Sequence, residues 1–127
     1  MISRKEELLA YLRQQGLQPK EEDFGIFFRY QMLNFLLFTD DDDPLYLRLV
    51  LPGIMDVDQN NREDVLEACN KVTGEMKVAK CFISDNADVW IACEQLMDKD
   101  PRFEDIIPRS LRILMGSQQA FLEAIDA

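Results

Sequence analysis

The chain has 127 residues, of which 47% are apolar and 30% are charged, and this composition excludes intrinsic disorder, a collagen-like fibre and a membrane span. Its 14 Lys and Arg residues against 24 Asp and Glu residues leave a net charge of -10, which repels phosphate backbones and anionic lipid surfaces. We therefore expect one soluble domain over residues 1–127, with neither nucleic acid nor a membrane as its partner.

The first predicted element is a helix over residues 4–15. Ser3 and Glu6 form a capping box at its start. Gly16 can adopt the left-handed conformation that ends many helices, and Leu17 can fold back onto the last turn. Both ends of this helix are thus marked in the sequence.

Alternation of apolar residues then predicts strands over residues 24–30, 33–39 and 45–51. The first two follow so closely that we expect a hairpin turning at Gln31-Met32, although this pair lacks the Asn-Gly chemistry that such turns prefer. The three strands in succession predict an antiparallel meander, which Pro52-Gly53 ends.

In the second half of the chain, a helical pattern of apolar residues again gives way to an alternating one. A helix begins at Asn60 or Asn61, strands over residues 77–84 and 88–94 form a second hairpin, and a closing helix has Pro108 in its first turn. The second helix is expected to turn four side chains inward: Val65, Leu66, Cys69 and Val72.

The order α-β-β-β-α-β-β-α predicts an α+β fold with a five-stranded antiparallel sheet and helices packed against it. We expect an apolar face under the two longer helices, formed by Ile26, Phe28, Leu47, Leu49, Ala79, Cys81, Ile83, Val89 and Ile91. The opposite face alternates aromatic residues with charged ones: Phe27, Arg29, Tyr46, Arg48, Lys80, Phe82, Trp90 and Glu94.

This mixed face has two interpretations. It is either an ordinary surface, on which long charged side chains and the second helix cover the aromatic rings, or a surface that binds a peptide or a second copy. Trp, Tyr and Arg are the residue types most enriched at such interfaces. The candidate partner-binding residues are Phe27, Arg29, Tyr46, Arg48, Phe82 and Trp90.

Catalytic chemistry has little support in the sequence. Histidine is absent, which removes the commonest general base and the usual metal ligand. No glycine-rich phosphate-binding motif occurs. The acidic run Asp40–Asp43 is expected in a solvated loop, where carboxylates are poorly suited to acid-base work. We expect no catalytic residue and no cofactor, and therefore no enzyme.

One segment imitates a calcium loop. Residues 56–67 place oxygen-bearing side chains at the ligand spacings of the template, but Asn61 stands where its central glycine belongs and Glu63 where its apolar residue belongs. We interpret the segment as the start of a helix and expect no metal site.

The three cysteines, Cys69, Cys81 and Cys93, include no CxxC pair and match neither a disulfide framework nor a zinc site. Each falls on a core-facing position, where a buried thiol is favoured over a reactive one. The amino terminus lacks the pattern of a secretory signal. These features predict a cytoplasmic protein.

Three segments, together with the element order, carry a resemblance that extends over nearly the whole chain. The strand exit Leu51–Ile54, the helix opening Asn61–Asn70 and the strand opening Lys77–Lys80 resemble the YbjN-like family, whose fold is similar to that of the bacterial type III secretion chaperones. The turn at Gln31-Met32 departs from the glycine-containing turn expected there.

The resemblance implies a homodimer that holds an extended segment of a client through apolar grooves and added strand contacts. YbjN-like proteins are regulators without a defined activity, so no catalytic residue carries over. We expect a non-enzymatic protein-binding module, chaperone-like or regulatory. The alternative is a sensory domain that binds a small ligand between helix and sheet.

Overall fold

The computed structural model describes residues 2–126, and the two terminal residues of the predicted domain lie outside this range. The elements in chain order are α1 (Arg4–Gln14), β1 (Lys20–Glu22), β2 (Gly25–Tyr30), β3 (Leu33–Phe38), β4 (Tyr46–Leu51), α2 (Arg62–Glu75), β5 (Ala79–Ile83), β6 (Val89–Leu96) and α3 (Phe103–Asp126). The predicted α+β class is confirmed. Within residues 2–126, no helix combines the length and the apolar character that crossing a bilayer requires.

The sheet has six strands in the order β1-β2-β3-β4-β6-β5, and every neighbouring pair is antiparallel. The prediction of five strands is therefore wrong, because it omitted β1. This strand consists of Lys20, Glu21 and Glu22, so it has no apolar alternation to mark it. It pairs with β2 through a two-residue turn that places Gly25 opposite Glu22.

Gly25 is required by its position between neighbouring backbones. Its φ is +151°, and a Cβ added there would lie 2.1 Å from the carbonyl oxygen of Leu37. No side chain fits at that distance, so only glycine allows β2 to approach β3 at this point.

Helix α1 is marked at both ends as the sequence predicts. The Ser3 side chain accepts a hydrogen bond from the backbone N–H of Glu6. At the other end Gly16 has a φ of +82°, and the backbone N–H of Leu17 donates to the carbonyl of Leu12 over 3.1 Å. These bonds satisfy backbone groups that every helix end leaves free.

Helix α3 begins at Phe103, so the prediction that it starts near Pro108 is wrong. Pro108 lies inside the helix, where it lacks the N–H that would bond one turn back. Contacts of the first turns with neighbouring elements hold this part helical. The Phe103 ring packs edge-on against Tyr11 at 5.9 Å, and the Gln95 side chain donates to the Ser110 hydroxyl over 2.5 Å.

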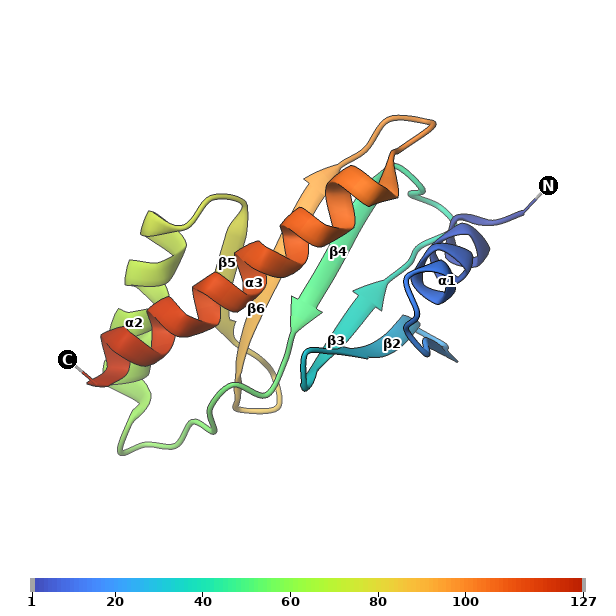
Figure 1. Cartoon of the computed structure of the whole chain (residues 1–127). Helices are drawn as coiled ribbons and strands as arrows, with labels where there is room; N and C mark the ends of the chain where they lie inside the picture. Colours follow the sequence, from blue (N-terminus) through green and yellow to red (C-terminus); the bar gives the residue numbers. More distant parts are fainter. Residues whose placement is uncertain (1, 127) are drawn as a thin grey trace.

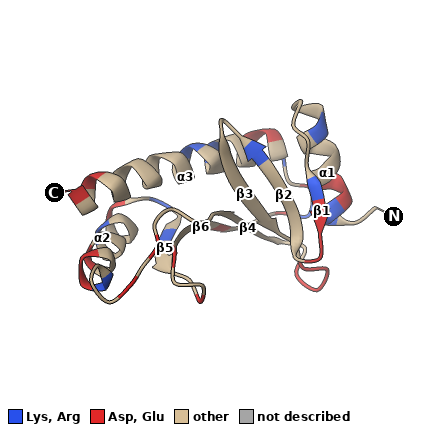
Figure 2. Cartoon of the chain, turned by 90° about the horizontal axis from the view of Figure 1, so that it is seen from below, with Lys and Arg blue, Asp and Glu red and all other residues tan. Residues whose placement is uncertain are grey.

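The three helices pack on one face of the sheet. Figure 1 shows α3 crossing the strands, with α2 beside β5 at one end and α1 near β2 at the other. Seen from below, in Figure 2, α3 lies above the sheet and no helix lies beneath β4, β6 and β5. The predicted apolar face is the covered one: all its residues are buried except Ile83, which is half-buried.

One inward residue of α2 was predicted wrongly. Leu66 is 47% exposed, and Ala68 is buried in its place beside Val65, Cys69 and Val72. Ala68 faces the end of α3, where it lines a hollow together with Ala124 and Ile125.

Candidate functional site

The sheet face opposite the helices is called the open face. Its centre is an aromatic cluster of Phe38, Phe82 and Trp90 from three different strands, all half-buried. The ring centroid of Trp90 lies 6.4 Å from that of Phe38 and 6.3 Å from that of Phe82. Strand register creates this cluster, because Phe82 is directly opposite Trp90. The indole N–H of Trp90 donates to the Asp88 carboxylate over 3.0 Å.

Arg48 lies beside this cluster, opposite Phe38 in the β3–β4 pair. Its guanidinium stands 4.7 Å above the centre of the Phe38 ring, a cation–π arrangement. Burial lowers the pKa of Arg48 from its ordinary value. Among residues 2–126, no carboxylate lies within ion-pair distance of this guanidinium. Arg48 is thus a half-buried cation whose charge no described side chain neutralises.

A shallow hollow of about 490 Å³ adjoins Arg48, Phe82 and Trp90 and continues along part of the β5–β6 turn, at Ser84, Asp85 and Asn86. Beside it, Glu94 accepts a hydrogen bond from the Tyr46 hydroxyl and pairs with the Lys80 ammonium at 2.7 Å. Glu94 is thereby engaged, whereas Arg48 has no ion-pair partner among residues 2–126.

The six candidate residues divide into two groups. Arg48, Phe82 and Trp90 come together at the hollow just described, and Tyr46 lies nearby through Glu94. Phe27 and Arg29 lie on β2, with β3 between them and β4. They line a separate hollow of about 430 Å³ beside the end of α1.

Sequence reasoning missed Phe38. It falls inside a predicted strand, but its face depends on the pairing of β3 with β4, which alternation within one strand does not reveal. A signal was available, since Leu36 and Phe38 alternate with the buried Phe35 and Leu37 and so belong to the other face.

The interpretation of this face as an ordinary surface has two parts, cover by charged side chains and cover by the second helix, and the structure supports only the first. Charged side chains do cover the rings in part, because Arg48 lies over Phe38 and the Lys80 ammonium lies 5.9 Å from the centre of Phe82. The second helix does not cover them. It packs on the other side, where Cys69 of α2 meets Cys81 of β5.

Both edges of the sheet are protected against added strands. At the β5 edge, the Thr73 hydroxyl of α2 accepts from the backbone N–H of Cys81 over 2.9 Å and approaches its carbonyl oxygen at 3.2 Å. These are the groups that an added strand would need. At the other edge, β1 is three residues long and entirely charged. The open face is therefore a better site for a partner than either edge.

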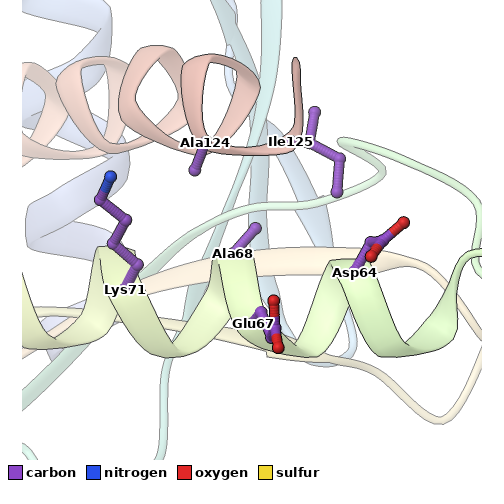
Figure 3. Close-up of a pocket in the computed structure, with 6 residues that line it drawn as sticks. All are labelled: Asp64, Glu67, Ala68, Lys71, Ala124 and Ile125. Carbon is purple, nitrogen blue, oxygen red and sulfur yellow. The ribbon is translucent and has the colours of Figure 1, made fainter. Parts of the chain in front are cut away.

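A third hollow, of about 300 Å³, lies between α2 and the end of α3 (Figure 3). Ala68, Ala124 and Ile125 supply its apolar part, and Asp64, Glu67 and Lys71 supply charges of both signs from α2. This α2–α3 groove contains none of the six candidate partner-binding residues, although Asp64 and Glu67 belong to the segment that imitates a calcium loop.

The segment that imitates a calcium loop serves as a helix start. The Asp58 carboxylate accepts from the backbone N–H groups of Asn60 and Asn61. The Asn61 side chain donates to the carbonyl of Asp56 and accepts from the N–H of Asp58. Within residues 2–126, no group of three or more Cys, Asp or Glu side chains is arranged to hold a metal ion.

Comparison with known proteins shows the fold. No family model matches the sequence, and no curated protein matches it. The crystal structure of YbjN from E. coli, a proposed transcription regulator, superposes with a TM-score of 0.71 at 10% identity, over 94% of this chain and 89% of that one. An uncharacterized protein from Methanothermobacter thermautotrophicus superposes with a TM-score of 0.67 at 10% identity, over 97% and 96%. The predicted YbjN-like fold is confirmed.

Proposed function

We propose that this chain is a non-enzymatic, cytoplasmic protein-binding module, chaperone-like or regulatory, that holds a segment of a partner polypeptide on its open face. The observation that carries the proposal is the half-buried cluster of Phe38, Phe82 and Trp90, over which no helix of the described residues packs. Aromatic residues beside an arginine are typical of the centres of protein interfaces. The YbjN-like fold agrees with this proposal, since YbjN is itself a proposed regulator.

The partner lies across the face and does not extend the sheet. Thr73 occupies the backbone groups of Cys81 at one edge, and β1 presents only charged residues at the other. Of the two modes expected for secretion chaperones, apolar contact is therefore favoured over strand addition.

The chemistry of the face defines the partner segment. Arg48 lacks a carboxylate partner among residues 2–126, and its planar guanidinium suits a bidentate carboxylate. Phe82 and Trp90 line the same hollow and suit an apolar or aromatic side chain. We expect the bound segment to carry an Asp, a Glu or a terminal carboxylate next to a large apolar residue.

Trp90 allows a direct test, because it is the only tryptophan in the chain. Peptides selected from a random library on the intact protein are titrated while Trp90 fluorescence is recorded. We expect binding to change its emission, since the ring loses contact with water. Arg48→Gln should weaken binding about tenfold or more, as loss of a hydrogen bond to a charged group costs about 1.5–3 kcal/mol.

Arg112→Gln is the matched control, because Arg112 is an exposed arginine on α3, away from the open face. It should leave peptide affinity unchanged. Peptides that bind without changing Trp90 emission, and equally well to both variants, would place the binding site elsewhere and refute the proposal.

We propose that the expected homodimer forms through the α2–α3 groove. A two-fold contact brings identical patches together, so a patch that carries both signs of charge can be complementary to itself. Asp64, Glu67 and Lys71 supply charges of both signs at this groove. Lys71→Glu should then raise the dimer dissociation constant in sedimentation equilibrium, while Trp90→Ala should not. A wild-type chain that stays monomeric up to high concentration would exclude the dimer.

A small-ligand sensory domain is the second candidate. One hollow does lie between helix and sheet, lined by Tyr11 and Leu12 of α1, Tyr30 of β2, and Ile107 and Leu111 of α3. Its volume of about 240 Å³ is below the roughly 300–1,000 Å³ of most ligand pockets, so it ranks lower. A thermal-shift screen in which metabolites stabilise the protein, and the selected peptides do not, would favour it.

A further inference from the structure

Two of the three cysteines meet in the core. The sulfur atoms of Cys69, on α2, and Cys81, on β5, lie 3.5 Å apart, and these residues are 4% and 6% exposed. Cys93 is also buried, but it has no second thiol within hydrogen-bond distance among residues 2–126. The chain thus contains a dithiol pair together with an isolated thiol in the same protein interior.

We propose that Cys69 and Cys81 form a modification site at which a hydroperoxide oxidises the two thiols to an intramolecular disulfide. The sulfur atoms already lie at the distance of direct contact, and a disulfide requires them to approach to about 2.05 Å. The two residues belong to different elements, so the new bond would fasten α2 to β5. This site is independent of the proposed partner-binding face.

The reaction balances with hydrogen peroxide as the oxidant. The Cys69 sulfur attacks one peroxide oxygen, a sulfur–oxygen bond forms, the oxygen–oxygen bond breaks, and the leaving oxygen departs as water after taking a proton. The Cys81 sulfur then attacks the Cys69 sulfur, the sulfur–oxygen bond breaks, and the second oxygen leaves as water. Two thiols and one peroxide give one disulfide and two waters, so both sulfurs are oxidised and both oxygens are reduced.

The hydrogen bond between the two thiols assigns the two roles. The Cys81 thiol donates to the Cys69 sulfur, which lowers the pKa of Cys69. The same bond, together with burial, raises the pKa of Cys81, and burial raises the pKa of Cys93. Because the thiolate is the nucleophile, Cys69 reacts first and Cys81 resolves the intermediate. Hydrogen peroxide is small and uncharged, and local opening of α2 admits it.

The test counts thiols in the intact protein. After treatment with hydrogen peroxide, free thiols are alkylated in denaturant and counted by mass spectrometry. We expect the count to fall from three to one, with a mass loss of two hydrogens and no intermolecular product. The oxidised protein should also melt at a higher temperature than the reduced one, because the bond constrains the unfolded chain.

A variant is needed to identify which two cysteines the disulfide links. Trypsin cleaves after Lys80 and Lys99, so Cys81 and Cys93 stay in one peptide. In Cys93→Ala, the peptide that contains Cys69 should still be linked to the peptide that contains Cys81. In Cys81→Ala, Cys69 should stop at a sulfenic acid that dimedone traps.

Two results would overturn the proposal. One is a wild-type chain that keeps all three thiols at peroxide concentrations that oxidise free cysteine. The other is a disulfide that disappears in Cys93→Ala. A wild-type chain that keeps all three thiols refutes the proposal even where a cysteine variant fails to fold, and no outcome of this test bears on peptide binding at the open face.

Discussion

At the scale of single residues, the hairpin turn between β2 and β3 carries backbone strain at two consecutive positions. Gln31 and Met32 have φ values of 50° and 67°, so both central positions of the turn are left-handed. This is the geometry of a type I′ turn, which strongly favours Asn-Gly. This conformation destabilises the folded state by roughly 1–2 kcal/mol for each residue that carries a Cβ.

Replacing the pair by Asn-Gly should therefore stabilise the protein. We expect Gln31→Asn with Met32→Gly to raise the free energy of unfolding by about 1 kcal/mol, measured by urea denaturation. Little packing is lost, because Met32 is 88% exposed. Gly16→Ala is the opposite control: Gly16 has a φ of +82° and nothing within 4 Å of an added Cβ, so about 1 kcal/mol should be lost through backbone strain alone. A destabilised Asn-Gly variant would contradict the type I′ assignment.

At the scale of elements, the contact between α2 and β5 protects the sheet edge. The Thr73 hydroxyl bonds the backbone of Cys81 at a position where an added strand would pair. Thr73→Val keeps the shape of the side chain and removes both hydrogen bonds. We expect a loss of about 1 kcal/mol in urea denaturation and increased self-association in light scattering.

Thr73→Ser retains the hydroxyl and is the matched variant. It should keep the protein monodisperse at concentrations where Thr73→Val associates. Equal association of the two variants would show that the hydroxyl does not guard this edge.

The elements also show what a sequence can predict. Helix α1 and strands β2 to β6 were predicted because each carries an apolar period or a strong end signal, such as Gly16 after α1. Strand β1 consists of three charged residues without an apolar period, and the first turn of α3 makes a contact distant in the chain, that between Phe103 and Tyr11. The same limit applies to the open face: Arg48 and Trp90 were singled out, whereas the place of Phe38 depends on strand pairing.

At the scale of the whole molecule, the helices seal one side of the sheet and leave the other side open (Figures 1 and 2). On the covered side, the apolar core holds the sheet and the helices together. On the open side, Val50 and Ala92 are fully buried by the larger side chains around them, so the face is closely packed without a covering helix. A partner would therefore find a preformed surface, which reduces the entropy lost on binding.

The charge of the whole molecule affects its stability. A net charge of -10 makes the folded chain repel itself, while the ion pairs that oppose this repulsion are largely exposed and individually weak. Raising the ionic strength from 10 mM to 150 mM shortens the screening length from about 30 Å to about 8 Å. It screens attraction and repulsion alike, and repulsion is the larger effect because acidic residues outnumber basic ones.

We therefore expect added salt to increase stability against urea by a few tenths to about 1 kcal/mol. Asp41→Asn with Asp42→Asn should reduce this increase, because it removes two charges from the run Asp40–Asp43, all of whose residues are exposed. Asp40 is left intact, since its carboxylate accepts the backbone N–H of Asp42 over 2.9 Å and a change there would also break that bond. Stability that falls as salt is added would mean that the ion pairs outweigh the repulsion. The excess of acidic residues would then not determine how stability depends on salt.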